Sequence, residues 1–388
     1  MRHPRHTAWA ALVLLALLIT VCAAQGADTG TGSTRNPSIT DPLPPVSAGP
    51  SATGTPGPNG SQALGLAEDL QYLTGADLDA RLDDYARLGV QWARFQLIWA
   101  NVQRSSPDEW SWSSTDAVVA GLVARGIRPL AVLGTTPPWA SRATGCNVDT
   151  CGPTNPKQFA AFAAVAAARY AGRVQAWEVW NEPNVDTFYK PSPDPVSYAA
   201  LLRAVGPALH AGDPAATVLF GGPAPSDDNA DPADGHVKRI QPVSFLARAY
   251  AAGVAGTFDA VGWHPYSYPD PPGGLNPSST WVLMYGSALS VREVMTSNGD
   301  KAKPVWGTEF GAPTVPASPG SLTEAEQAAQ LGGGIDLWRR YSWTGPLFLY
   351  QLRDRGTDPT NREDFFGLQR HDGSPKLAYD AVADRVVR

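Results

Sequence analysis

The 388-residue chain has few of the residues that usually hold catalytic metals, with six histidines and three cysteines in total. None of the histidines stands in an HExxH pattern or a comparable ligand cluster, so we expect no catalytic metal. The sequence also lacks a GxSxG elbow, which argues against a serine esterase. No Gly-rich phosphate loop follows the first predicted strand, where the chain runs Leu66-Ala67-Glu68-Asp69-Leu70. We therefore expect no nucleotide cofactor.

Basic residues are in the minority. The chain has 30 Lys and Arg against 36 Asp and Glu, which gives a formal net charge of −6. Nucleic-acid binding depends on Lys and Arg at the phosphates, so an acidic chain is a poor candidate for it. A neutral partner such as a sugar is compatible with this charge, and nothing in the sequence implies a stable protein partner.

Long apolar runs are missing except near the N-terminus, where Ala8–Val21 follows a basic start. That run is too short to cross a bilayer comfortably, because a membrane helix needs about 20 apolar residues. Residues 1–26 are predicted to be a signal peptide, and the Gly-, Ser-, Thr- and Pro-rich residues 27–62 a disordered linker. The expected location is secreted or cell envelope. Lipidation of Cys22 is the alternative to plain cleavage, and only then do we expect membrane attachment.

Two further cysteines, Cys146 and Cys151, lie close together among Gly, Asn, Asp and Pro. In an exported protein this arrangement suggests a disulfide that pins one loop.

The remaining residues, 63–388, alternate between short apolar runs and longer helical patterns. The predicted strands are Leu64–Ala67, Trp92–Ile98, Pro129–Leu133, Val174–Trp180, Thr217–Gly221, Ala260–Trp263, Pro304–Thr308 and Pro346–Tyr350. The predicted helices are Asp77–Leu88, Thr115–Ala124, Phe159–Tyr170, Tyr198–His210, Val243–Ala252, Ala288–Thr296, Glu324–Tyr341 and Leu377–Val387. Eight strand–helix pairs predict an α/β fold, a (β/α)8 TIM barrel, with a doubly wound open sheet as the competing architecture.

Two glutamates stand where predicted strands end. Glu182 closes the segment that follows the fourth strand, and Glu309 closes the seventh strand. Residues at the carboxyl ends of barrel strands point into the active site. Burial near Trp177 and Trp180 is expected to raise the pKa of Glu182, as a general acid needs. Two carboxyl groups facing each other across a cleft are the parts of glycoside hydrolysis.

The motifs around these glutamates resemble a known group of enzymes. Asn181-Glu182-Pro183 after the fourth strand and Thr308 to Gly311 after the seventh resemble the clan A glycoside hydrolases. The longer string WEVWNEPN, Trp177 to Asn184, most resembles family 39, with family 5 next nearest. The resemblance implies that Glu182 is the acid/base and Glu309 the nucleophile of a retaining double displacement.

The same resemblance implies supporting roles for four other residues. Asn181 is expected to bond the 2-hydroxyl of the sugar, and Arg94 to hold the nucleophile by a charge-assisted hydrogen bond. His264 and Tyr266, in the segment WHPY, match residues of the sixth strand, and Tyr266 is expected to donate its hydroxyl to the nucleophile. The last strand carries Gln351 where clan A enzymes usually have a Trp.

Strand geometry raises one difficulty at the first glutamate. Side chains alternate along a strand, so Asn181 and Glu182 would point to opposite faces. Both serve one site only if the strand bends or bulges there. Glu178, four residues earlier, is expected to be a buried structural residue, with Arg94 as its candidate partner.

The chain is rich in tryptophan, with 13 in total. Aromatic faces stack on the C–H faces of sugars, so several of them are candidates for substrate contact. Trp139 and Trp180 are the strongest candidates, and Trp306 is a further one.

Together these observations predict a retaining glycosidase that cleaves O-glycosidic bonds of an extracellular poly- or oligosaccharide. Long loops around the barrel mouth favour endo action. The alternatives are an exo-acting, β-xylosidase-like enzyme, a transglycosylase, and a carbohydrate-binding protein without turnover.

Overall fold

The structure is a computed structural model that describes residues 62–141, 149–230, 236–274, 276–286, 289–316 and 321–386. The predicted signal peptide 1–26, including Cys22, and all but the last residue of the linker 27–62 lie outside the described residues. Among the residues that are described, no helix is long and apolar enough to cross a membrane.

Eight parallel strands close into a barrel in the order β1-β10-β9-β8-β5-β4-β3-β2. Their bounds are β1 Leu64–Ala67, β2 Trp92–Ile98, β3 Arg128–Gly134, β4 Ala176–Val179, β5 Thr217–Phe220, β8 Ala260–Trp263, β9 Val305–Phe310 and β10 Thr344–Leu349. The pair β6 Asn229–Ala230 and β7 Val237–Arg239 forms a separate two-stranded sheet. The predicted TIM barrel is confirmed, and β1, β2 and β8 have the bounds predicted from the sequence.

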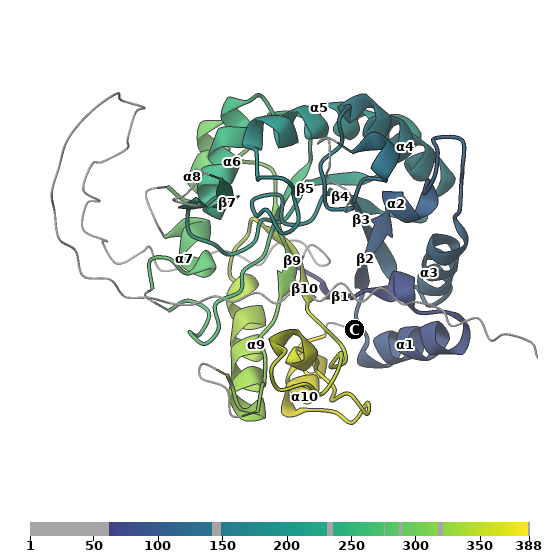
Figure 1. Ribbon diagram of the computed structural model, residues 1–388. Coiled ribbons are helices and arrows are strands. Elements are labelled where there is room, and N and C mark those ends of the chain that lie inside the picture. The colour runs from purple at the N-terminus through teal and green to yellow at the C-terminus, as the bar shows by residue number, and fades with distance from the viewer. Residues whose placement is uncertain are drawn as a thin grey trace, which may run out of the picture. The chain divides into compact units, whose positions relative to one another are not determined.

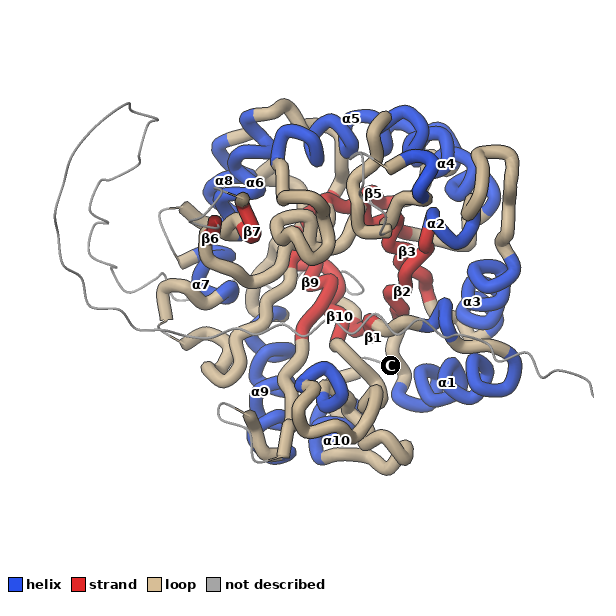
Figure 2. Tube along the Cα trace, in the orientation of Figure 1, coloured by secondary structure: helices blue, strands red, loops and turns tan. Residues whose placement is uncertain are grey.

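Helices surround the barrel as an outer ring (Figures 1 and 2). The main helices are α1 Gly75–Leu88, α3 Ser113–Ala124, α4 Pro156–Arg169, α5 Pro195–Gly212, α6 Pro242–Ala251, α8 Val291–Ser297, α9 Glu324–Trp338 and α10 Leu377–Ala383. Short α-helices are α2 Trp99–Val102 and α7 Thr280–Tyr285, and 3₁₀ turns cover Leu70–Tyr72, Pro138–Ala140 and Arg362–Phe365.

The N-terminal ends of the helices explain why two of them begin about one turn before the predicted start. α4 and α5 open on Pro156 and Pro195, and proline at the first helical position has no N–H to leave unpaired. The preceding residues, Asn155 and Asp194, cap these helices through their side chains. The apolar periodicity used for prediction is visible only after this first turn.

The inside of the barrel at its N-terminal end is filled by large aromatic rings. Trp92 and Trp306 meet edge to face with centroids 5.2 Å apart, and Phe348 packs on both. Gly345 makes room for them, because a Cβ there would lie 2.4 Å from the Trp306 ring. The prediction that Trp306 contacts substrate is therefore wrong: the side chain is core packing at the end opposite the strand ends that carry the glutamates.

Candidate active site

The backbone turns sharply where β4 ends. The strand stops at Val179, and Trp180 and Glu182 both have positive φ angles, 72° and 47°. Such angles are uncommon outside glycine and break the alternation of side chains along the strand. The predicted bend is confirmed, and it turns Asn181 and Glu182 toward the same site.

Two glycines after β5 make room for this bend. A Cβ on Gly221 would lie 2.5 Å from the carbonyl oxygens of Val179 and Trp180. The next glycine, Gly222, accepts a hydrogen bond from the Glu182 N–H at 3.0 Å and donates its own N–H to Glu178 at 2.8 Å. The glycine pair thus allows close backbone contact between β4 and β5.

Glu309, in β9, is held at both carboxylate oxygens. Arg94 Nη1 donates to Oε1 at 2.7 Å, and the Tyr266 hydroxyl donates to Oε2 at 2.9 Å. Burial raises the pKa of Glu309, but the charges of His264 and Arg94 and these hydrogen bonds outweigh it, so the pKa lies below its ordinary value. The group is therefore held as a carboxylate.

Arg94, in β2, connects the two strand ends that carry the glutamates. Its guanidinium is 4% exposed and donates to Glu178 at 2.6 Å, Asn181 at 2.6 Å and Glu309 at 2.7 Å. Burial opposes its charge, but the two carboxylates raise its pKa above the ordinary value.

Glu178 lies beneath this arginine and is completely buried. Besides Arg94, it accepts the Thr308 hydroxyl at 2.9 Å and the Gly222 N–H at 2.8 Å. The expected structural pairing of Glu178 with Arg94 is confirmed. Thr308 and Gly222 were missed as supports, because neither residue type signals such a role in sequence.

Glu182 has a different environment. Its Oε1 lies 2.9 Å from Nδ1 of His264, a fully buried residue at the end of β8. Burial is the largest effect on Glu182 and raises its pKa; His264 and Arg94 oppose the rise only in part. The two glutamates thus have pKa values displaced in opposite directions, the arrangement that separates an acid from a nucleophile.

The two carboxyl groups and the histidine are close together. Glu182, His264 and Glu309 each present one oxygen or nitrogen, and these three atoms lie within 4.8 Å of one another. The set fits a metal poorly, because the Arg94 guanidinium already contacts Glu309. In addition, the charges of Glu309 and Glu182 overcome burial and raise the pKa of His264, which favours its protonated, non-ligating form.

The two tryptophans predicted most strongly to contact substrate, Trp139 and Trp180, differ in their burial. Trp139 is half-buried beside the mouth loops and donates its Nε1–H to the Gln103 carbonyl at 2.9 Å. Trp180 is 2% exposed and packs on Phe159 and Tyr189, so the prediction that it contacts sugar is wrong. Its positive φ turns the ring into the core while the next two residues face the site.

The end of β10 supplies residues that sequence reasoning missed. Gln351 is buried, but the preceding Tyr350 is half-exposed and donates its hydroxyl to Glu363 at 3.2 Å. Burial raises the pKa of Tyr350 well above its usual range, and the nearby carboxylates of Glu363 and Glu309 add to this. An aromatic directly after the last strand was the available signal.

The disulfide prediction is only partly covered. Cys151 is buried, whereas Cys146 lies outside the described residues, so the pairing stays a prediction.

A parallel barrel with Asn-Glu at the end of β4 and a second glutamate at the end of β9 has the architecture of the clan A glycoside hydrolases. Within that clan the chain resembles family 39, and family 5 next, as its motifs indicate. No protein-family model matches the sequence, and no curated protein matches it.

Solved structures carry this comparison. A family 39 glycoside hydrolase from Bacteroides cellulosilyticus WH2 is 26% identical with a TM-score of 0.64, over 84% of this chain and 63% of that chain. A GH39 enzyme from Xanthomonas axonopodis pv. citri is 21% identical with a TM-score of 0.63, over 86% and 67%. A GH5_18 protein from Streptomyces cattleya in complex with GlcNAc is 19% identical with a TM-score of 0.61, over 84% and 80%. The chain therefore spans less than two thirds of the first of these proteins.

Proposed function

We propose that this protein is a retaining glycoside hydrolase in which Glu309 is the nucleophile and Glu182 the acid/base. The observation that carries the proposal is the carboxyl pair, whose nearest ligand atoms lie within 4.8 Å of each other and whose pKa values are displaced in opposite directions. Retaining glycosidases have carboxyl groups about 5–5.5 Å apart, whereas inverting ones need about 6.5–9.5 Å to admit a water.

In the first step a Glu309 oxygen bonds to the anomeric carbon while the bond to the leaving oxygen breaks. Glu182, whose pKa is raised by burial, gives its proton to that oxygen. In the second step Glu182 takes a proton from water, the water oxygen bonds to the anomeric carbon, and Glu309 leaves as a carboxylate. Arg94 and Tyr266 hold Glu309 at both oxygens, which fixes its direction of attack.

Asn181 is positioned for the sugar by the same arginine. Because its Oδ1 accepts from Arg94 at 2.6 Å, the amide presents its NH₂ group as a donor. This suits a 2-hydroxyl next to the anomeric carbon, where a hydrogen bond that strengthens in the transition state contributes to catalysis. Tyr350, directly after β10, is a partly exposed aromatic ring and a candidate for sugar contact.

The first experiment is hydrolysis of a panel of aryl β-glycosides and β-linked polysaccharides by the full chain, with Glu182→Gln and Glu309→Gln as matched isosteric variants. We expect at least one substrate to be cleaved and both variants to lose nearly all activity. Full activity in either variant would overturn the assignment. Proton NMR of the first-formed product distinguishes the mechanisms, since retention gives the β-anomer and inversion the α-anomer.

We further propose that the protein acts outside the cytoplasm and cleaves within polysaccharide chains. The apolar N-terminal run supports export, and the long segments after β3, β5, β8 and β10 support an open mouth. Early products from a β-1,4-xylan or β-1,4-mannan separate the two modes of action. A ladder of oligosaccharides supports endo action, and monosaccharide alone supports the exo-acting alternative.

A further inference from the structure

An aromatic pair, in which Trp110 is exposed and Trp112 is partly buried, lies on the loop between α2 and α3. The rings of Trp110 and Trp112 are nearly parallel, with centroids 5.5 Å apart and an angle of 13°. Both are also nearly parallel to Phe162 of α4, which is buried beneath them. Trp110 is 41% exposed although tryptophan is normally well covered.

The loop that carries Trp110 is ordered by its own hydrogen bonds. Gln103 accepts the Trp99 Nε1–H at 2.6 Å and donates to the Pro107 carbonyl at 2.5 Å. Farther along, the Ser105 N–H donates to Glu109 at 2.8 Å, and the Ser111 N–H donates back to Val102 at 2.9 Å. An exposed tryptophan on a fixed loop needs little additional ordering to bind a ligand, so the entropic cost of binding is low.

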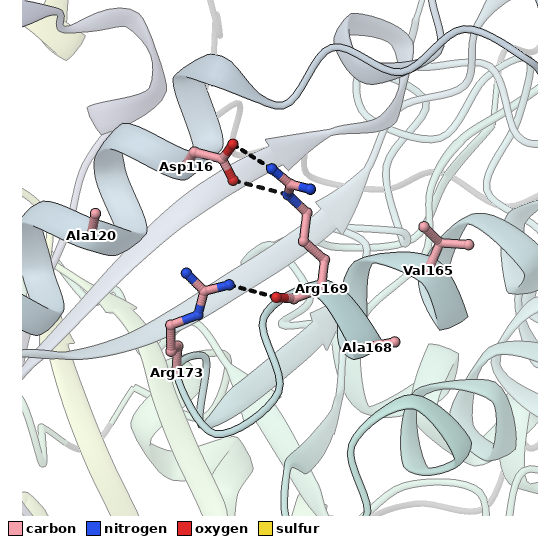
Figure 3. Close-up of a pocket in the computed structure, with 6 residues that line it drawn as sticks. All are labelled: Asp116, Ala120, Val165, Ala168, Arg169 and Arg173. Carbon is pink, nitrogen blue, oxygen red and sulfur yellow. Dashed lines mark hydrogen bonds and ion pairs between the residues drawn. The ribbon is translucent and has the colours of Figure 1, made fainter.

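A hollow of about 700 Å³ lies between α3 and α4 beside this pair. Figure 3 shows its lining, in which Arg169 forms a two-point ion pair with Asp116 while Arg173 donates to the Arg169 carbonyl. The same Arg169 guanidinium lies 5.3 Å from the centre of the Trp112 ring, so the hollow and the aromatic pair are contiguous. Both members of the ion pair are 39% exposed and remain open to a ligand.

We propose that Trp110, Trp112 and the Asp116–Arg169 pair form a second carbohydrate-binding site, which holds a neutral polysaccharide chain on the flank of the barrel. The exposed Trp110 ring, stacked on Trp112, offers a flat apolar surface for a pyranose ring, and the adjoining carboxylate and guanidinium offer acceptor and donor atoms for its hydroxyls. Asp116 is paired with Arg169, Arg173 donates to the Arg169 carbonyl, and the chain as a whole is acidic; we therefore take a neutral polymer as the ligand.

The choice of a sugar as ligand rests on the proposed function, but the site is separate from the glutamates. The catalytic pair lies at the ends of β4 and β9, whereas Trp110 and the hollow lie on the loop before α3 and on the outer helices α3 and α4 (Figure 1). The site would keep the enzyme on an insoluble polymer between cleavage events without contacting the reacting bond.

The test uses the full chain carrying Glu309→Gln, so that the polymer is bound but not degraded. Retention on insoluble β-1,4-xylan and on insoluble β-1,4-mannan is compared with and without Trp110→Ala. The matched control is Tyr285→Ala, which removes another exposed ring, 37% exposed, from α7. We expect Trp110→Ala to weaken retention about tenfold or more, as truncation of a central aromatic anchor does. Tyr285→Ala should leave retention unchanged.

A second pair of variants keeps the result interpretable if Trp110→Ala is poorly folded. Trp110→Tyr retains an aromatic ring and should restore most of the retention, while Asp116→Asn removes the charge of the ion pair and should weaken it. In the active chain, aryl β-glycoside hydrolysis should be the same with and without Trp110→Ala. The second site is overturned if the chain is retained on neither polymer, or if its retention does not depend on Trp110. It is also overturned if the chain binds neither polymer but self-associates, and Trp110→Ala abolishes that self-association. None of these results depends on catalysis, so they leave the proposed function untouched.

Discussion

Nη1 of Arg94 lies 2.7 Å from Oε1 of Glu309, and this contact joins β2 to the end of β9. The same guanidinium also holds Glu178 and Asn181 near the end of β4. One arginine therefore fixes the position of Glu309 relative to the strand end that leads to Glu182. Because the guanidinium is planar and rigid, its three bonds leave little freedom in that geometry.

Replacing Arg94 by lysine tests this geometry while keeping the charge. An ammonium group on a flexible stem cannot contact three acceptors in the same directions. We expect kcat to fall by about 10²-fold, the usual cost of misplacing a reacting group by about 1 Å. KM should change less than kcat. Equal activity of Arg94→Lys and the parent in steady-state kinetics would mean that charge alone suffices.

Glu178→Gln tests whether this buried carboxylate positions Arg94. Without the negative charge of Glu178, less of the positive charge of Arg94 is neutralised, so Arg94 should lower the pKa of Glu309 further. The acid limb of activity should then move to lower pH. Breaking one side of a buried ion pair is also expected to cost about 3–5 kcal/mol of stability.

The control for Glu178→Gln is Asp336→Asn, an equivalent change in an exposed pair with Arg385 at 2.8 Å. Its effect on stability should stay within about 0.5 kcal/mol. If Glu178→Gln lowers only the melting temperature and leaves the pH profile unchanged, the residue is purely structural.

The pH dependence follows from the opposite shifts of the two glutamates. Activity needs Glu309 deprotonated and Glu182 protonated, so it should fall below the lowered pKa of Glu309 and above the raised pKa of Glu182. His264 lowers the pKa of both groups, since its protonated ring favours both carboxylates. His264→Gln should therefore move both limbs of the kcat/KM profile to higher pH.

Tyr266→Phe separates the two limbs. Of the two glutamates, only Glu309 accepts a hydrogen bond from the Tyr266 hydroxyl, and this bond lowers the pKa of Glu309. The substitution should move the acid limb to higher pH and leave the alkaline limb at the same pH. Movement of the alkaline limb alone would mean that the roles of Glu182 and Glu309 are reversed.

Gly222→Ala tests the close contact behind Glu182. The added Cβ would lie 2.5 Å from the His264 ring and 2.6 Å from the Thr308 hydroxyl, so the site must shift. We expect a loss of about 1–3 kcal/mol in unfolding free energy, as for other overpacked positions, together with reduced activity. The matched control is Gly333→Ala in α9, where nothing lies within 4 Å and alanine should stabilise the helix by about 0.5–1 kcal/mol. Denaturant unfolding measures both.

Sequence alone predicted the barrel and the position of the two glutamates at its strand ends, because both depend on local signals. Strands such as Trp92–Ile98 are apolar runs with clear boundaries, and Glu182 stands directly after one of them. Even the bend between Asn181 and Glu182 was predictable, since strand alternation and a shared site are incompatible without it.

The missed features depend on contacts between distant segments. Trp180 and Trp306 are equally aromatic in sequence, but one is turned into the core by its positive φ and the other lies at the far end of the barrel. The role of Gly222 rests on the His264 ring approaching from β8, which no local pattern reports. Tyr350 is partly exposed whereas Gln351 is buried, and this difference depends on packing around β10.

Covalent trapping tests whether Glu309 is the nucleophile. The protein is incubated with a 2-deoxy-2-fluoro version of the aryl β-glycoside that it hydrolyses fastest, and intact mass and peptide mapping locate the label. We expect one added glycosyl group, attached to Glu309 and absent from the Glu309→Gln variant. A label on another residue, or turnover without any trapped intermediate and with inverted product, would contradict it.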